Sequence, residues 1–213
     1  MTPATEQSTE QDTPRVRRRG GPSKGDQREA QILAATRELL TDRGVNDLTI
    51  DAIAKAAGVS RTAFYFYFPT KQAVVAALLD GLWEQFGRTH GWFDSTGPDR
   101  AGLREHHRQV AEVWREHHAT LTCTTGFVDY EPLVDWVDRA HARFVAGLAA
   151  KVERDRRDGL APAGPEPMAM AELVSDLRDA RFRVIAQQTG AAFDRMVDDL
   201  TEVVLRMVYG RWS

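Results

Sequence analysis

The sequence of 213 residues contains one cysteine, Cys123, so it can form no intrachain disulfide and no cysteine-based zinc cluster. Its longest strictly apolar run, residues 73–79, is far shorter than the roughly 20 residues that cross a membrane. The first 30 residues lack the apolar segment of a secretory signal. We therefore expect a cytoplasmic protein without a membrane partner.

An overall positive charge is also absent, because the formal net charge is −3. The charges are unevenly distributed, however. Residues 13–71 hold eleven Lys and Arg against six Asp and Glu, whereas the residues from 72 onward hold 17 basic and 22 acidic side chains. A basic front and an acidic remainder indicate a two-part molecule whose front meets a polyanion.

Alternation of apolar and polar residues is nowhere sustained, whereas apolar residues repeat at helical spacing through most of the chain. The sequence therefore predicts an all-α protein with about nine helices. Capping residues, glycines and prolines place the clearest of them near residues 26–43, 50–57, 61–68, 71–86, 100–118, 132–157, 168–188 and 191–209.

Residues 48–68 have the pattern of a helix-turn-helix, in which two short helices flank Ala-Gly-Val. Thr49 and Ser60 are suited to cap the two helices. Gly58 fits the tight turn between them, which needs a positive φ. A small α-subdomain without a nucleic-acid function is the alternative interpretation of this pattern.

In the second of these helices, Phe64 and Phe68 lie four residues apart and are expected to face inward. The helical step of 100° then turns Arg61, Thr62 and Tyr65 outward. An arginine can bind guanine O6 and N7 through two hydrogen bonds, and a threonine can contact a base or a thymine methyl. Tyr65 suits a phosphate or a methyl group.

The segment at residues 49–60, TIDAIAKAAGVS, is followed at 64–71 by FYFYFPTK. Together they resemble the DNA-binding domain of TetR-family transcriptional regulators, and within that family the EthR-type repressors of actinobacteria. Weaker similarity to the EthR type occurs at residues 153–156 and 208–210. The resemblance implies a homodimer with N-terminal helix-turn-helix heads and a C-terminal body that binds an effector and forms the dimer. It also implies DNA contacts from Thr49, Arg61, Thr62, Tyr65, Tyr67 and Lys71.

A basic cluster precedes the first helix. It resembles a flexible arm that reaches a minor groove or phosphates, and a solubilising tail is the alternative. We therefore expect a disordered basic arm at residues 1–25, a helix-turn-helix domain at 26–72 and an effector-binding and dimerisation domain at 73–213. The predicted DNA-binding residues are Arg17, Arg18, Arg19, Lys24, Thr49, Ser60, Arg61, Thr62, Tyr65, Tyr67 and Lys71.

The body carries apolar stripes with large aromatic side chains on neighbouring helices. Such stripes are more often core than ligand pocket, but the resemblance implies an effector cavity between these helices. The helix near 170–188 differs from the EthR-type pattern by its charged residues, one of which we expect to face an anionic group. The predicted pocket residues are Leu103, His107, Val110, Trp114, Trp136, Phe144, Leu148, Leu177 and Arg181.

Two histidine doublets, at 106–107 and 117–118, lie about 16 Å apart along one predicted helix, too far to share a metal ion. We expect mostly solvated histidines and no bound metal. No catalytic motif is visible, so we expect neither an enzyme nor a cofactor. Cys123 has no neighbouring cation in the sequence and is expected to be inert.

The last two predicted helices have broad apolar faces that a second subunit would cover. These features favour a ligand-responsive repressor that binds double-stranded DNA as a homodimer on a palindromic operator, and that a small, mostly hydrophobic effector releases. A helical-bundle metal protein or enzyme using the histidine doublets is the alternative. A protein-binding module whose head no longer touches DNA is a third possibility.

Overall fold

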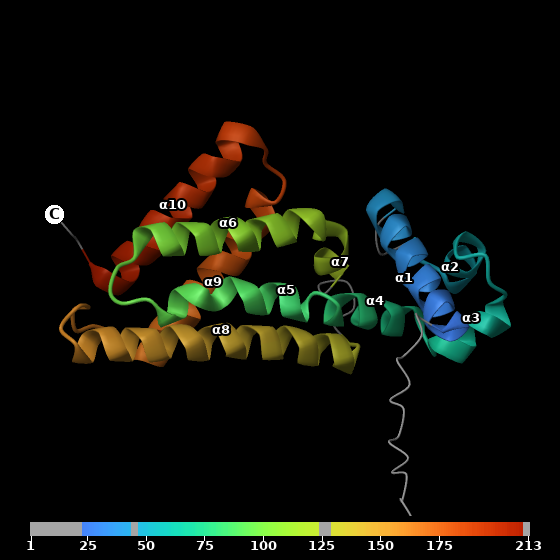
Figure 1. Ribbon diagram of the computed structural model, residues 1–213, viewed down its shortest axis with the longest axis horizontal. Coiled ribbons are helices and arrows are strands. Elements are labelled where there is room, and N and C mark those ends of the chain that lie inside the picture. The colour runs from blue at the N-terminus through green and yellow to red at the C-terminus, as the bar shows by residue number, and fades with distance from the viewer. Residues whose placement is uncertain (1–22, 44–46, 124–128, 211–213) are drawn as a thin grey trace, which may run out of the picture.

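The computed structural model describes residues 23–43, 47–123 and 129–210, and within these ranges the protein is all-helical, as predicted. Figure 1 shows a head that contains the first three helices at one end, joined through α4 to an elongated helical body. The elements are α1 (Lys24–Arg43), α2 (Ile50–Ala56), α3 (Arg61–Tyr67), α4 (Lys71–Asp80), α5 (Trp83–Arg88), the 3-10 helix η1 (Thr89–Asp94), α6 (Arg100–Glu116), α7 (His118–Thr122), α8 (Glu131–Arg157), α9 (Pro167–Ile185) and α10 (Gly190–Tyr209).

Helix α1 begins earlier than the sequence predicted, because its cap is Ser23 and not Asp26. The backbone N–H of Asp26 donates to Ser23 Oγ over 3.1 Å, and the backbone N–H of Ser23 donates to Asp26 Oδ2 over 2.9 Å. This reciprocal pair satisfies two N–H groups at the start of the helix.

The predicted helix at 71–86 is divided into α4 and α5 near Gly81. The backbone N–H of Gly81 bonds to carbonyls at the end of α4, and α5 begins at Trp83. The ring centroids of Trp83 and Phe86 then lie 6.3 and 6.2 Å from that of Trp136 on α8. The division therefore places the aromatic residues of α5 against α8, whereas the apolar residues of α4 pack in the head.

Two clusters of buried apolar residues hold the molecule together. The body cluster joins η1, α6, α8, α9 and α10 around residues such as Leu148, Phe182 and Val197. The head cluster contains Ile32 and Phe64, and it continues through α4 to Leu121, Leu133 and Trp136. The core of the head is therefore continuous with side chains of α7 and α8. The predicted domain boundary between residues 72 and 73 falls inside α4, whose apolar residues belong to this head cluster.

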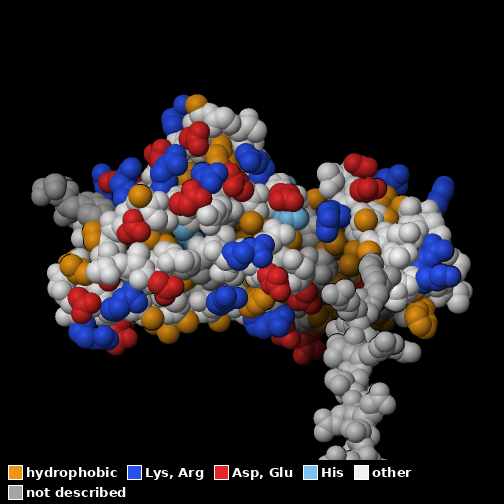
Figure 2. All heavy atoms as spheres, viewed as in Figure 1, with side chains coloured by type: hydrophobic (Ala, Val, Ile, Leu, Met, Phe, Trp, Pro, Cys, Tyr) orange, Lys and Arg blue, Asp and Glu red, His pale blue; other side chains and the backbone are white. Residues whose placement is uncertain are grey.

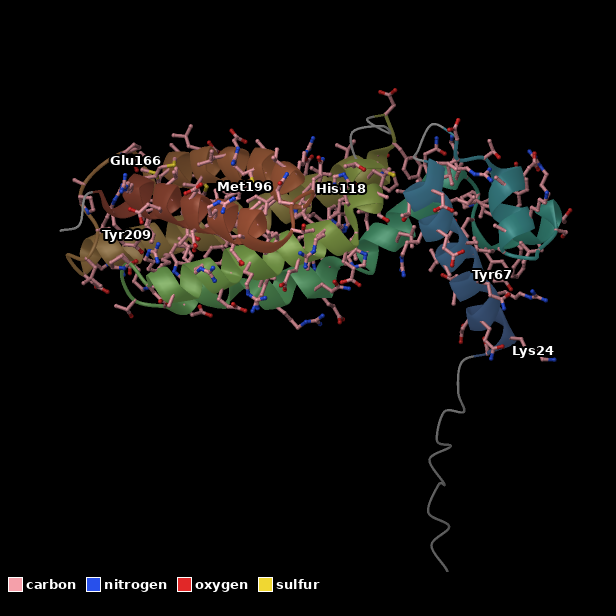
Figure 3. All side chains as sticks on the ribbon, turned by 90° about the horizontal axis from the view of Figure 1, so that it is seen from above. Lys24, Tyr67, His118, Glu166, Met196 and Tyr209 are labelled. Carbon is pink, nitrogen blue, oxygen red and sulfur yellow. The ribbon has the colours of Figure 1, made fainter. Side chains whose placement is uncertain are left out.

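A buried polar network closes the end of the body remote from the head, where Figure 3 labels Tyr209. The Lys151 ammonium lies 3.0 Å from Asp155 Oδ2 and donates to the carbonyls of Ser95 and Gly97. Tyr209 donates its hydroxyl hydrogen to Asp155 Oδ2 over 2.6 Å. The network joins α8, α10 and the segment between η1 and α6.

None of the helices in the described residues has the length and apolar character needed to cross a membrane.

Candidate DNA-binding surface and ligand cavity

The turn between α2 and α3 has the local structure that the sequence predicted. Thr49 Oγ1 accepts a hydrogen bond from the backbone N–H of Ala52, and Ser60 Oγ accepts one from Ala63. Gly58 has a φ of 65°, in the left-handed region that favours glycine. These contacts fix both short helices, so α3 presents its side chains from a rigid support.

The outward face of α3 is also confirmed. Phe64 and Phe68 are buried, whereas Arg61, Thr62 and Tyr65 are exposed. Phe66, in the middle of the same helix, is 83% exposed and was not among the residues predicted from the sequence to bind DNA. The helical step that placed Tyr65 outward would also have found Phe66, because residue 66 lies about 200° around the helix from the buried Phe64.

Arg61 is held by two neighbours. Its Nη1 lies 2.6 Å from Asp51 Oδ1 on α2, and its Nη2 donates to Tyr65 Oη over 3.1 Å. The hydrogen bond to Asp51 raises the pKa of Arg61 above its usual value. The guanidinium is therefore oriented on the exposed surface and remains charged.

The other predicted DNA-binding residues occupy different surroundings. Lys71 donates from its ammonium to the Leu48 carbonyl over 2.8 Å, which joins α4 to the segment before α2. Tyr67 is half-buried, with its ring edge-on to Phe66, and Lys24 is exposed at the start of α1. Figure 3 shows both Tyr67 and Lys24 in the head, and Figure 2 shows basic side chains at the outer edge of the head. The predicted contacts at Arg17, Arg18 and Arg19 lie outside the described residues.

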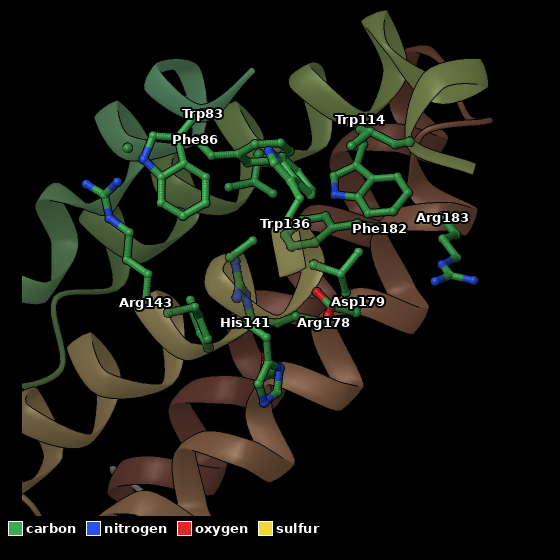
Figure 4. Close-up of a pocket in the computed structure, with 17 residues that line it drawn as sticks. Trp83, Phe86, Trp114, Trp136, His141, Arg143, Arg178, Asp179, Phe182 and Arg183 are labelled. Atoms are coloured by element: carbon green, nitrogen blue, oxygen red, sulfur yellow. The ribbon is translucent and has the colours of Figure 1, made fainter. Parts of the chain in front are cut away.

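The body contains a partly open cavity of about 130 Å³ between α5, α6, α7, α8 and α9. Figure 4 shows the indole rings of Trp83, Trp114 and Trp136 around it, together with Arg143 and Arg183 at its sides. Its lining consists of Trp83, Phe86, Gly87, Val110, Trp114, Leu121, Trp136, Val137, Ala140, His141, Arg143, Phe144, Ser175, Arg178, Asp179, Phe182 and Arg183. Most of these residues are apolar or aromatic, with charged groups confined to α8 and α9.

Four of the nine predicted pocket residues line this cavity: Val110, Trp114, Trp136 and Phe144. The other five do not, and the structure corrects their placement. Leu103 and Leu148 are buried in the body cluster, and Leu177 packs against that cluster. Arg181 lies on α9 outside the lining, where Arg178 and Arg183 take its place, because at 100° per residue Arg181 is turned roughly 130° away from the face that residues 178, 179, 182 and 183 share.

His107 also faces away from the cavity. It is fully buried, and its Nδ1 lies 3.0 Å from Thr201 Oγ1 on α10. Thr201 donates its own hydroxyl hydrogen to the Val197 carbonyl, so His107 Nδ1 carries the hydrogen of this bond. Burial is the main cause that lowers the pKa of His107 well below its usual value, and the charge of Arg178 adds to it.

The expectation of solvated histidines is wrong for three of the four doublet residues, since His106, His107 and His117 are buried. Sequence could not show this for His106 and His107, because their partners lie in distant helices. His106 Nδ1 bonds to the Thr89 carbonyl, and its Nε2 lies 3.1 Å from Arg178 Nη2. Among the residues that the structure describes, no group of three His, Cys, Asp or Glu side chains is placed to hold a metal ion.

Cys123 is buried, and its Sγ lies 3.0 Å from the Ala119 carbonyl. Burial raises the pKa of its thiol to about 11. The thiolate, which is the reactive form, is therefore scarce near neutral pH.

Comparison with known proteins agrees with this geometry. The profile of the family described as bacterial regulatory proteins, tetR family, matches residues 32–78, and the profile described as the C-terminal domain of the transcriptional regulator EthR matches residues 103–210. The HTH-type transcriptional regulator EthR of Mycobacterium tuberculosis strain H37Rv is 48% identical over 215 residues, which cover 97% of this chain and 98% of that protein. EthR of Mycolicibacterium smegmatis is 33% identical over 93% of both chains.

Solved structures share the same fold. A putative TetR-family regulator from Rhodococcus sp. has a TM-score of 0.67 at 18% identity, over 84% of this chain and 99% of that one. FadR of Thermus thermophilus, a TetR-family repressor in complex with lauroyl-CoA, has a TM-score of 0.54 at 24% identity, over 87% of this chain and 97% of that one. The capped helix-turn-helix and the matching family profiles together identify a DNA-binding transcriptional regulator. The chain belongs to the TetR family of bacterial transcriptional regulators, and it is EthR-like over most of its length.

Proposed function

We propose that this chain is a repressor that binds a palindromic operator as a homodimer and leaves it when a small molecule enters the cavity. The observation that carries this proposal is the continuity of the head cluster with the cavity wall. The packed side chains behind the exposed face of α3 extend to Leu121 and Trp136, which line the cavity.

DNA reading is assigned to the exposed face of α3. Arg61 would bind a guanine, and Thr62, Tyr65 and Phe66 would contact bases or thymine methyl groups. We assign phosphate contacts to Tyr67 and Lys71, and further DNA contacts to Thr49 and Ser60 at the starts of the two helices. In a dimer, two copies of α3 would enter successive major grooves one helical turn apart, or a multiple of it.

The dimer surface is assigned to α9 and α10, as the sequence predicted. Leu173 and Val184 on α9 are 55% and 43% exposed, and Val203 on α10 is 44% exposed. Exposed aliphatic side chains on two adjacent helices favour a symmetric partner, because a second copy would cover the same surface. The two subunits would then form a four-helix interface.

Release from DNA is assigned to movement of α4. This helix carries head-cluster residues such as Val74 and Leu78, and beyond Gly81 the chain continues into α5, where Trp83 and Phe86 line the cavity. A ligand that displaces α5 would shift the head with it. Moving the population from 1:99 to 99:1 requires a preference of about 5.5 kcal/mol for the released state.

The DNA assignment is tested by selecting bound fragments from the native genome and measuring affinity for a selected fragment and for unrelated DNA. Arg61→Ala should lose roughly five- to hundredfold in the ratio of the two affinities. Arg157→Ala makes the same change of charge on an exposed residue of the body and should leave the ratio unchanged. Equal loss on both DNAs for Arg61→Ala would contradict the assignment.

The dimer assignment is tested by sedimentation. Leu173→Asp with Val203→Asp should give a monomer, whereas Leu160→Asp, at a similarly exposed leucine outside these helices, should remain a dimer. A dimer that persists in the double variant would refute this interface.

A further inference from the structure

We infer that the cavity takes a small organic carboxylate, with Arg178 binding the carboxylate and the aromatic side chains enclosing the apolar part. This inference rests on the proposed function and specifies its ligand, which the sequence had indicated as mostly hydrophobic with an anionic group facing one of the charged residues of α9.

Arg178 is a buried cation that forms no ion pair among the described residues. The side chain is 5% exposed, and its Nη2 makes one hydrogen bond, to His106 Nε2. Its Nε is buried without a hydrogen-bond partner, and the neighbouring Asp179 attracts the guanidinium without an ion pair being formed. An arginine offers five N–H donors, and burial of its charge is unfavourable unless an anion compensates it.

His106 orients the guanidinium and does not neutralise it. The Thr89 carbonyl can only accept, so His106 Nδ1 carries the hydrogen of that bond. In the neutral ring Nε2 then presents its lone pair to Arg178 Nη2. The side chain is fixed further by Phe144, because Arg178 Cζ lies 3.6 Å from the centre of that ring. The cation is therefore held rigidly at the wall of the cavity.

The charges around the cavity favour an anion. Arg143, Arg178 and Arg183 line it, against one carboxylate, that of Asp179, which attracts Arg178 and whose pKa is raised mainly by burial. His141 is occupied by Ser175, whose Oγ lies 3.1 Å from His141 Nδ1. Because the domain as a whole is acidic, this local excess of positive charge is a property of the cavity and not of the surface. A carboxylate matches a guanidinium through two parallel hydrogen bonds.

The size and walls of the cavity restrict the apolar part. Its volume of about 130 Å³ is close to that of an engineered cavity of about 150 Å³ that holds benzene. The indoles of Trp83, Trp114 and Trp136 provide flat apolar walls (Figure 4). One aromatic ring or a short alkyl chain with a single carboxylate therefore fits both the volume and the charge.

The test compares carboxylates with neutral amides of the same shape, using phenylacetate against phenylacetamide and hexanoate against hexanamide. Binding is followed by the fluorescence of the tryptophans that line the cavity. We expect at least one carboxylate to bind tenfold or more tightly than its amide. Equal or tighter binding of the amide in both pairs, or no binding of either carboxylate, would overturn the inference.

Variants then identify the residue responsible. Arg178→Met should abolish the preference for the carboxylate, and Arg178→Lys should retain part of it. Arg181→Met, on the same helix but outside the lining, is the matched control and should bind like the unchanged protein. A preference that survives Arg178→Met but disappears in Arg183→Met would place the anion at the rim and overturn the assignment. If Arg178→Met does not melt cooperatively, Arg178→Lys is compared with the unchanged protein instead. An unchanged affinity of Arg178→Lys for the carboxylate would overturn the assignment to Arg178.

The effect on DNA is measured separately, on a fragment selected as above. Release of DNA by the amides alone would leave the repressor proposal intact and overturn the carboxylate inference. Selective carboxylate binding with unchanged affinity for DNA would support the inference and contradict the proposed ligand response.

Discussion

Arg61, the first residue of α3, forms an ion pair with Asp51, the second residue of α2, over 2.6 Å. The pair crosses the turn of the helix-turn-helix and holds in place the side chain that we assign to a guanine. Both side chains are largely exposed, so the pair contributes little to folding stability. Its effect is expected in DNA recognition.

Asp51→Asn should therefore reduce the discrimination between selected and unrelated DNA while increasing affinity for unrelated DNA. The orientation of Arg61 is weakened, and one negative charge near the phosphates is removed. Binding titrations with both DNAs measure the two effects. Asp47→Asn is the control, because it removes an exposed carboxylate from the head outside this pair. The same result for both variants would show that the Arg61 contact has no role in discrimination.

Deleting residues 1–20 should weaken binding to every DNA sequence and reduce its dependence on salt. The deletion removes Arg17, Arg18 and Arg19 but keeps Ser23, which caps α1. Each lost phosphate contact should reduce the slope of log affinity against log salt by about 0.9. Titrations at several salt concentrations measure this slope, and an unchanged slope would exclude the arm.

The buried network at the end of the body should be important for stability. Asp155→Asn leaves the ammonium of Lys151 buried without its counter-ion, and it should reduce the free energy of unfolding by about 3–5 kcal/mol. Urea denaturation measures the change. Glu153→Gln, which breaks an exposed pair with Arg157 on the same helix, should have little effect. Similar losses for both variants would contradict this account.

Stability should decrease as the pH falls below about 6.5, through His107. The folded pKa lies well below that of the unfolded chain, mainly because the ring is buried, so the unfolded state binds more protons at low pH. The contribution of neutral His107 to the free energy of unfolding is fully present above the unfolded pKa. Below that pKa it decreases by up to about 1.4 kcal/mol per pH unit. His107→Asn should flatten this dependence in denaturation curves from pH 7 to pH 5. An unchanged slope would assign the effect to other groups.

Features that depend on neighbouring residues could be predicted from the sequence, whereas features that depend on residues far apart in the chain could not. The caps at Thr49 and Ser60, and the positive φ at Gly58, depend on neighbouring residues and were predicted correctly. The break near Gly81 was missed, because the apolar spacing continues across it from α4 into α5. The contact between Arg178 and His106 joins residues that lie 72 positions apart, so no local pattern could reveal it.

The continuity between the head cluster and the cavity has a consequence for variation in this protein. Leu121 and Trp136 pack with the side chains that support α3 and also face the ligand space. A substitution at either position would alter operator affinity and ligand affinity together. New ligand preferences would therefore arise most readily through cavity residues outside that cluster, such as Ser175 and Phe182 on α9.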